Sequence, residues 1–110
     1  MKLPNGDRAD LGTKLQDYLL NPGHRSGRHK ARVFESTLGI TRENQDILVN
    51  ALHQAAANSR NAISTGDQDF GATFEIRFPL TTDKGTVTVL SAWIIRYGED
   101  FPRLVTCFII

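Results

Sequence analysis

The hydrophobic pattern of the sequence changes once, near residue 65, and this change constrains the fold more than any other feature. Before it, apolar residues recur at intervals of three and four, which is typical of amphipathic helices. After it, apolar and polar residues alternate between clusters of turn-forming residues, which indicates strands. The order predicts an α+β fold in which two or three N-terminal helices pack on one face of a three- to four-stranded antiparallel sheet.

Helical spacing and helix-terminating residues define the first half of the chain. Helices are expected over 13–20, 27–38 and 41–58. Thr13 and Gln16 match a capping box, Ser26 is the expected N-cap of the second helix, and Thr41 is that of the third. Gly39 is expected to end the second helix in a left-handed conformation.

The second half of the chain predicts strands over 72–80, 86–97 and 103–110. In the first of these, Phe74, Ile76, Phe78 and Leu80 alternate with polar residues, and Pro79 suggests an edge position. The polar residues 59–69 are expected to connect the helices to the sheet. The expected core comprises Leu19, Phe34, Leu38, Leu48, Leu52, Phe74, Ile76, Phe78 and most apolar residues of the last hairpin.

Length and composition favour a single domain over residues 1–110, with 40% apolar residues. The apolar runs are too short to span a bilayer, and the first ten residues lack the apolar region of a signal peptide, so we expect a cytoplasmic protein. Cys107 is the only cysteine and lies in an apolar run. We expect a buried, structural thiol rather than a nucleophile.

The positive charge is concentrated in the first half of the chain, around the segment NPGHRSGRHKAR at residues 21–32. This segment contains four of the thirteen Lys and Arg residues and two of the three histidines, without an acidic residue. Residues 1–60 contain nine Lys and Arg against six Asp and Glu, whereas residues 61–110 contain four against six. The asymmetry is too small to indicate nucleic-acid binding by itself.

Several short segments resemble an uncharacterised family of small bacterial and phage domains, which occur alone or at the ends of larger toxin-like and phage proteins. These segments are YLLNP, the step GxxKAxxF, LGIT, the strand around Trp93, and PRLVT. Helices before a small antiparallel sheet also resemble the barnase–EndoU–colicin–RelE class of metal-independent ribonucleases. The resemblance implies RNA cleavage by transesterification, with no cofactor. The implied partners are RNA and a cognate inhibitor protein, and no membrane.

Four residues are the candidate catalytic groups under this hypothesis. Lys30, near the start of the second helix, would stabilise transition-state charge together with Arg96. His29 would act as a general base, and Thr106 would orient the phosphate. The alternative interpretations are a solvated helix-start lysine, a solvated loop histidine and a solvated strand-end arginine.

Three further residues are candidate substrate-binding groups, namely Arg28, Trp93 and Arg103. If the last turn centres on Glu99 and Asp100, Trp93 lies opposite Thr106 and could stack a base beside it. A shift of one residue would separate them, and burial of Trp93 in the core is the alternative.

A non-catalytic binding or interaction module of the same fold is the competing hypothesis for the function. The spacing of the three histidines matches no metal-binding signature, so no metal site is expected. The position of Lys30 relative to the last hairpin discriminates the two hypotheses. Clustering in an open cleft favours the enzyme, and separation favours the module.

Overall fold

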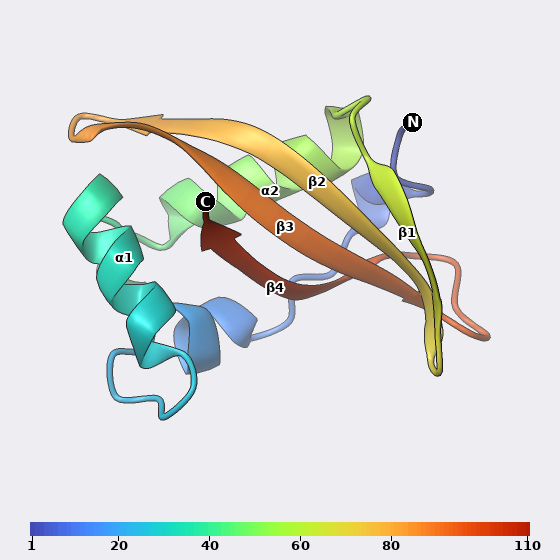
Figure 1. Ribbon diagram of the computed structural model, residues 1–110, viewed down its shortest axis with the longest axis horizontal. Helices are drawn as coiled ribbons and strands as arrows, with labels where there is room; N and C mark the ends of the chain where they lie inside the picture. The colour runs from blue at the N-terminus through green and yellow to red at the C-terminus, as the bar shows by residue number, and fades with distance from the viewer.

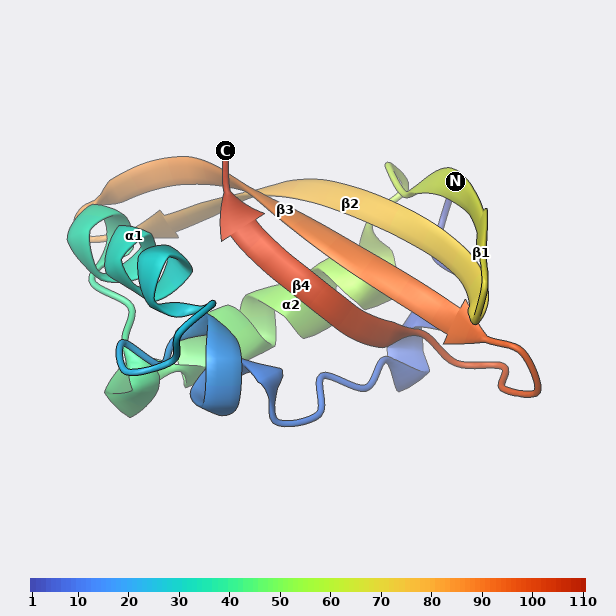
Figure 2. The same ribbon diagram turned by 60° about the horizontal axis from the view of Figure 1, so that its bottom comes forward.

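The computed structural model describes residues 1–110, apart from the side chain of Gln68. Helical segments precede a four-stranded antiparallel sheet, as predicted. In chain order the helical segments are η1 (Gly6–Arg8), η2 (Leu15–Leu19), α1 (Arg28–Leu38), η3 (Arg42–Asn44) and α2 (Asp46–Asn58). The strands that follow are β1 (Ile63–Gln68), β2 (Gly71–Thr82), β3 (Gly85–Arg96) and β4 (Arg103–Ile109). Figures 1 and 2 show the helices on one side of the sheet, which leaves its other face, called here the outer face, open.

The sheet has the strand order β1-β2-β3-β4. Three of its strands agree with the prediction, but β1 lies where a polar connection was expected. Apart from Ile63 this segment has no apolar residue, so its sequence gives no strand signal. Backbone pairing to β2 forms the strand, together with a hydrogen bond of 2.7 Å from Thr65 Oγ1 to Thr73 Oγ1.

Pro79 lies in the part of β2 that β1 does not reach, because the pairing of β1 ends at Glu75. Pro79 is paired with Thr88 of β3 on one side only. The edge position predicted from this proline is therefore correct locally, although β2 is an inner strand of the sheet as a whole. Proline has no N–H group, and at this position its absence removes no hydrogen bond between strands.

The segment predicted as a helix over 13–20 forms a short π-helical turn instead. The Leu20 N–H donates to Leu15 O, five residues back, at 2.7 Å. No side chain caps this turn, so the capping box of Thr13 and Gln16 does not form. The wider turn buries Leu15, Leu19 and Leu20 together, and this burial explains why the irregular geometry is favoured.

Helix α1 begins one residue later than predicted and ends at the predicted residue, and its N-cap residue is Gly27 rather than Ser26. His24 Nδ1 accepts hydrogen bonds of 3.0 Å from the N–H groups of both Ser26 and Gly27. Gly27 is required at this point because a Cβ would lie 1.9 Å from Tyr18 O. Gly39 ends the helix at φ 71°, as predicted.

The expected helix over 41–58 is divided into η3 and α2. Thr41 Oγ1 accepts from the Glu43 N–H at 3.3 Å, which confirms Thr41 as the cap. Asn44 completes a capping box with Thr41: its side-chain oxygen accepts from the Thr41 N–H at 2.7 Å, and its side-chain N–H donates to Gly39 O at 3.0 Å.

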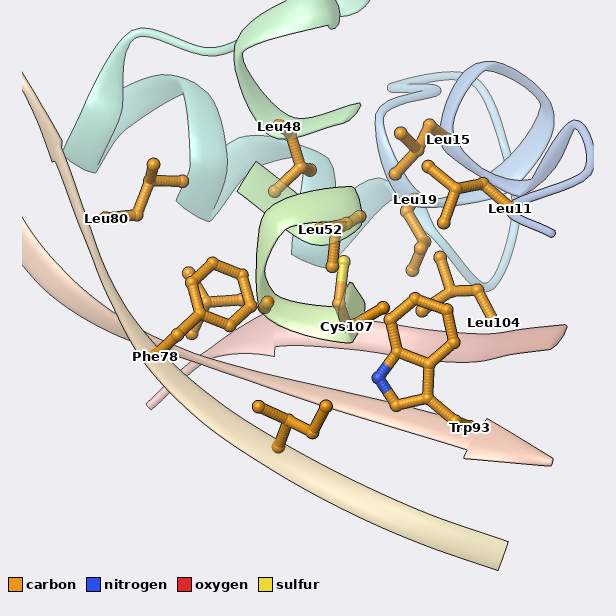
Figure 3. Packing of buried hydrophobic residues seen from close by; sticks show 14 of the residues in the cluster. Leu11, Leu15, Leu19, Leu48, Leu52, Phe78, Leu80, Trp93, Leu104 and Cys107 are labelled. Atoms are coloured by element: carbon orange, nitrogen blue, oxygen red, sulfur yellow. The ribbon is translucent and has the colours of Figure 1, made fainter. Parts of the chain in front are cut away.

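The hydrophobic core lies between the helices and the sheet. All eight residues predicted by number are buried there, including Phe34, which is fully buried. Figure 3 shows Trp93 beside Leu104 and Cys107, with Leu19 and Leu52 reaching them from the helical side. Ser91 is the one buried polar residue among the described side chains, and its hydroxyl donates to Ile76 O at 3.0 Å.

Candidate functional site

Lys30 lies in the first turn of α1, and Tyr18 of η2 holds its ammonium group. The distance from Lys30 Nζ to Tyr18 Oη is 3.3 Å, and Nζ lies 5.4 Å from the centre of the Tyr18 ring. The side chain is half-buried. No carboxylate forms a salt bridge with it in the described part of the chain. The charge is thus positioned without being neutralised.

A pocket of about 330 Å³ opens beside this lysine and is called here the Lys30 pocket. It lies between the start of α1 and the end of β4. Its lining residues are Ser26, His29, Lys30, Val33, Phe108 and Ile109. The structure therefore brings His29 and Lys30 together, and Phe108 of β4 is among the residues that line the same pocket. Arg28 is exposed and is not part of the lining.

Cys107 lies in the core next to this pocket. Burial raises the pKa of the Cys107 thiol to about 12, while the nearby Lys30 ammonium acts in the opposite direction. The thiol is therefore protonated at neutral pH, which confirms the prediction of a buried structural cysteine. The influence of Lys30 also indicates that its charge lies close to β4.

Thr106 does not lie opposite Trp93, so the predicted register of the last hairpin is wrong. Trp93 pairs with Leu104 and Thr106 pairs with Ala92, since the register shifts between Ala92 and Trp93. This irregularity leaves Val105 without a partner on β3. As a result Trp93 faces the core and Thr106 faces the outer side of the sheet.

Trp93 is a core residue and cannot stack a base in this structure. Its side chain is 0% exposed. Its indole Nε1 donates a hydrogen bond of 2.9 Å to Ser91 Oγ, so the polar atom is satisfied internally. The assignment of Trp93 as a substrate-binding residue is therefore corrected to the structural alternative.

Thr106 carries an unusual hydroxyl group. Its Oγ1 is buried and has no hydrogen-bond partner among the described residues. Thr106 and Phe108 pair with Ala92 and Leu90, which places them side by side on the outer face, and Phe108 also lines the Lys30 pocket. A buried polar atom without a partner is rare in folded proteins, so this hydroxyl needs an explanation.

Arg96 and Arg103 lie at the other end of the sheet. Phe108 pairs with Leu90, which is six residues from Arg96 on β3. At about 3.3 Å per residue, the separation is roughly 20 Å. The structure therefore joins Lys30 and His29 in one pocket and keeps Arg96 and Arg103 apart from them.

The two arginines line a larger depression of about 660 Å³, called here the hairpin-end pocket. Arg103 donates to Glu99 through Nε at 2.9 Å and Nη2 at 2.8 Å, and to Asp10 Oδ2 through Nη1 at 3.1 Å. Arg103 is therefore a structural clamp that holds the last turn to the N-terminal segment. Arg96 is exposed and forms no salt bridge with a described residue.

Sequence analysis assigns no role in a site to Tyr18, His24, Phe70 or Tyr97. Tyr18 and His24 are twelve and six residues from Lys30, and only the fold brings the Tyr18 hydroxyl to the ammonium group. Phe70 and Tyr97 are aromatic residues next to turns, where side chains are seldom buried. Their position next to turns could therefore have indicated that both rings are exposed.

The described residues include no group of three or more His, Cys, Asp or Glu side chains that could hold a metal ion. None of the described helices has the length and apolar character needed to cross a membrane.

No curated protein and no solved structure is similar enough to match the chain. Residues 2–110 match a family described as a domain of unknown function, DUF6883. The match covers nearly the whole chain and confirms the resemblance to an uncharacterised domain. The chain therefore belongs to the DUF6883 family.

Proposed function

We propose that the protein is a toxin-like, metal-independent ribonuclease whose chemistry takes place in the Lys30 pocket. One observation carries the proposal. The Lys30 ammonium is half-buried, held by Tyr18 Oη at 3.3 Å, and without a carboxylate partner among the described residues. A fixed, unneutralised cation beside an open pocket suits the charge that develops on a phosphate during cleavage.

The reaction that fits this pocket is transesterification within RNA. The 2′-oxygen attacks the adjacent phosphorus, the bond from phosphorus to the 5′-oxygen breaks, and a 2′,3′-cyclic phosphate and a 5′-hydroxyl result. The proton of the 2′-hydroxyl passes to a base, and a proton is delivered to the leaving 5′-oxygen. His29 is the candidate base because it lines the pocket and is exposed to substrate.

Lys30 would contact the non-bridging phosphate oxygens, and Tyr18 would position it through its hydroxyl group. Phe108, which also lines the pocket, would stack against a base. Thr106 would orient the phosphate only if its hydroxyl turned out of its buried position, which lacks a partner within the described part of the protein. Arg96 lies too far away to share the reacting phosphate.

The resemblance of several short segments to domains of toxin-like and phage proteins also supports this proposal. RNA is then the substrate, the cytoplasm is the proposed site of action, and a cognate inhibitor would be needed where the protein is produced.

The direct test is incubation of purified protein with total RNA in the presence of EDTA. Cleavage with 2′,3′-cyclic phosphate ends, identified by mass spectrometry, is the expected result. A matched oligonucleotide with a 2′-deoxyribose at the cleaved position should remain whole, because it lacks the nucleophile. Cleavage that requires added metal, or that leaves 3′-hydroxyl ends, would contradict the mechanism.

The second candidate is a non-catalytic binding or interaction module of the same fold, here taken as one that binds RNA. The separation of Arg96 from Lys30 by roughly 20 Å favours it, because the two predicted charge-stabilising residues cannot act on one phosphate. It predicts that RNA stays whole at micromolar protein while a complex forms. The incubation described above therefore distinguishes the two candidates.

A further inference from the structure

The hairpin-end pocket presents two aromatic rings that the core does not use. Phe70, in the turn from β1 to β2, is 74% exposed, and Tyr97, after β3, is 66% exposed. Both line the pocket with Val105, which is 41% exposed. Among the described residues six large hydrophobic side chains are exposed, and three of them line this one depression. Exposed apolar side chains that cluster in one depression are typical of a binding surface.

The two rings come from turns that are fixed to each other by the backbone. The Tyr97 N–H donates to Phe70 O at 2.9 Å. Gly71 allows the close approach of the strands, because a Cβ there would lie 2.1 Å from Ile95 O. The relative position of the two turns is therefore set before any ligand binds, which reduces the entropy lost on binding.

The charged groups around the rings are mixed. Lys14 and Arg96 line the pocket without a salt bridge to a described residue, and Asp69 is likewise without one. Arg103 is held by Glu99 and Asp10. Two cations are thus available to phosphates, whereas most binding surface is aromatic and aliphatic. This balance suits a ligand with planar, apolar faces on an anionic chain.

We infer that the hairpin-end pocket binds bases of single-stranded RNA by stacking on Phe70 and Tyr97, with Arg96 and Lys14 contacting the adjacent phosphates. The inference rests on the proposed function and deepens it. The pocket lies roughly 20 Å along the sheet from the Lys30 pocket, so a strand of several nucleotides would reach both. It selects single strands because a paired base cannot offer its face to a ring.

The binding test uses the full chain carrying Lys30→Ala, to suppress cleavage, and a fluorescein-labelled oligouridylate of about 12 nucleotides, within the range that single-strand sites cover. Affinity is measured by fluorescence anisotropy. We expect the double substitution Phe70→Ala and Tyr97→Ala to weaken binding tenfold or more, and Arg96→Gln to weaken it severalfold. A double-stranded RNA of equal length should bind more weakly than the single strand.

Two matched controls keep the test specific. Ile63→Ala removes an exposed apolar side chain outside the pocket, and Arg60→Gln removes an exposed arginine outside it. Neither should change the affinity. Circular dichroism and thermal unfolding check that the aromatic variants fold, and Phe70→Trp provides a second variant that should retain binding because its ring also stacks.

Several outcomes would overturn the inference. They are equal affinity of the aromatic variants and their parent, no binding of the single strand, and a concentration-dependent dimer that the aromatic substitutions dissolve. The last would make a second copy of the chain the occupant. The proposed function fails separately, if protein with an intact Lys30 binds the strand but leaves RNA whole.

Discussion

The ammonium of Lys30 and the hydroxyl of Tyr18 lie 3.3 Å apart, although the residues belong to separate helical segments. Tyr18 is in the π-helical turn, and Lys30 is in the first turn of α1. Gly27 makes the approach possible, since any side chain there would collide with Tyr18. The irregular turn and the glycine together set where the charge lies.

Tyr18→Phe removes this hydroxyl and keeps the ring. We expect the free energy of unfolding to fall by about 0.5–1.5 kcal/mol, the usual contribution of one hydrogen bond. We expect kcat for RNA cleavage to fall about tenfold with little change in KM, because Lys30 remains present but is held less firmly. Steady-state kinetics with an RNA oligonucleotide measure kcat and KM. A change in KM alone would contradict a positioning role for Tyr18.

Thr106→Val tests the hydroxyl that has no partner. Valine has nearly the same shape, and removing an unsatisfied buried hydroxyl should leave the free energy of unfolding unchanged or raise it by up to about 1 kcal/mol. If the hydroxyl is kept for function, RNA cleavage should fall in the same variant. Thermal unfolding and cleavage rates, measured together, check this. A clear loss of stability would mean that Thr106 has a hydrogen bond in solution.

His24→Ala should destabilise the protein by about 1 kcal/mol, because two backbone N–H groups at the start of α1 lose their acceptor. His24→Asn should recover part of this loss, since an Asn side-chain oxygen can accept from the N–H two residues on. Denaturant unfolding gives both values. Equal stability of the two variants would show that ring packing against Tyr18, rather than capping, is what matters.

The last hairpin should weaken in acid. Hydrogen bonds from Arg103 lower the pKa of Glu99, and a hydrogen bond from Arg8 lowers that of Asp100. A lowered pKa in the folded state stabilises the fold at any pH above the ordinary value, and that stability is lost as the pH falls through the lowered value. Glu99→Gln should therefore reduce stability at neutral pH and flatten its decline below pH 4.5. An unchanged pH profile of thermal unfolding would contradict this.

The sequence predicts the parts of the fold that follow regular hydrophobic spacing. Phe34 and Leu38 of α1, and Phe74 to Leu80 of β2, lie in the core as their spacing indicates. The missed features depend on backbone contacts or on single-residue irregularities. Strand β1 forms through pairing with β2, and the shift near Val105 moves Thr106 away from Trp93. No periodic pattern contains that information.

The candidate site was only partly predictable for the same reason. Lys30 and His29 are neighbours in the sequence, and the structure keeps them in one pocket. The sequence analysis predicts that Arg96, in the last hairpin, acts together with Lys30. Arg96 lies at the far end of a twelve-residue strand. Tyr18 could not be assigned from spacing, because a π-helical turn changes which side chains point the same way.

The role of Lys30 is the central claim, and one rate comparison tests it most directly. Wild type, Lys30→Ala and the exposed control Lys2→Ala are incubated with one RNA oligonucleotide in EDTA, and initial rates of cyclic-phosphate formation are measured. We expect Lys30→Ala to be slower by about 10²-fold or more, as for other single groups that stabilise transition-state charge, and to lose about as much stability as Tyr18→Phe, because the same hydrogen bond is removed. Lys2→Ala should match wild type. Equal rates for Lys30→Ala and wild type would contradict the account.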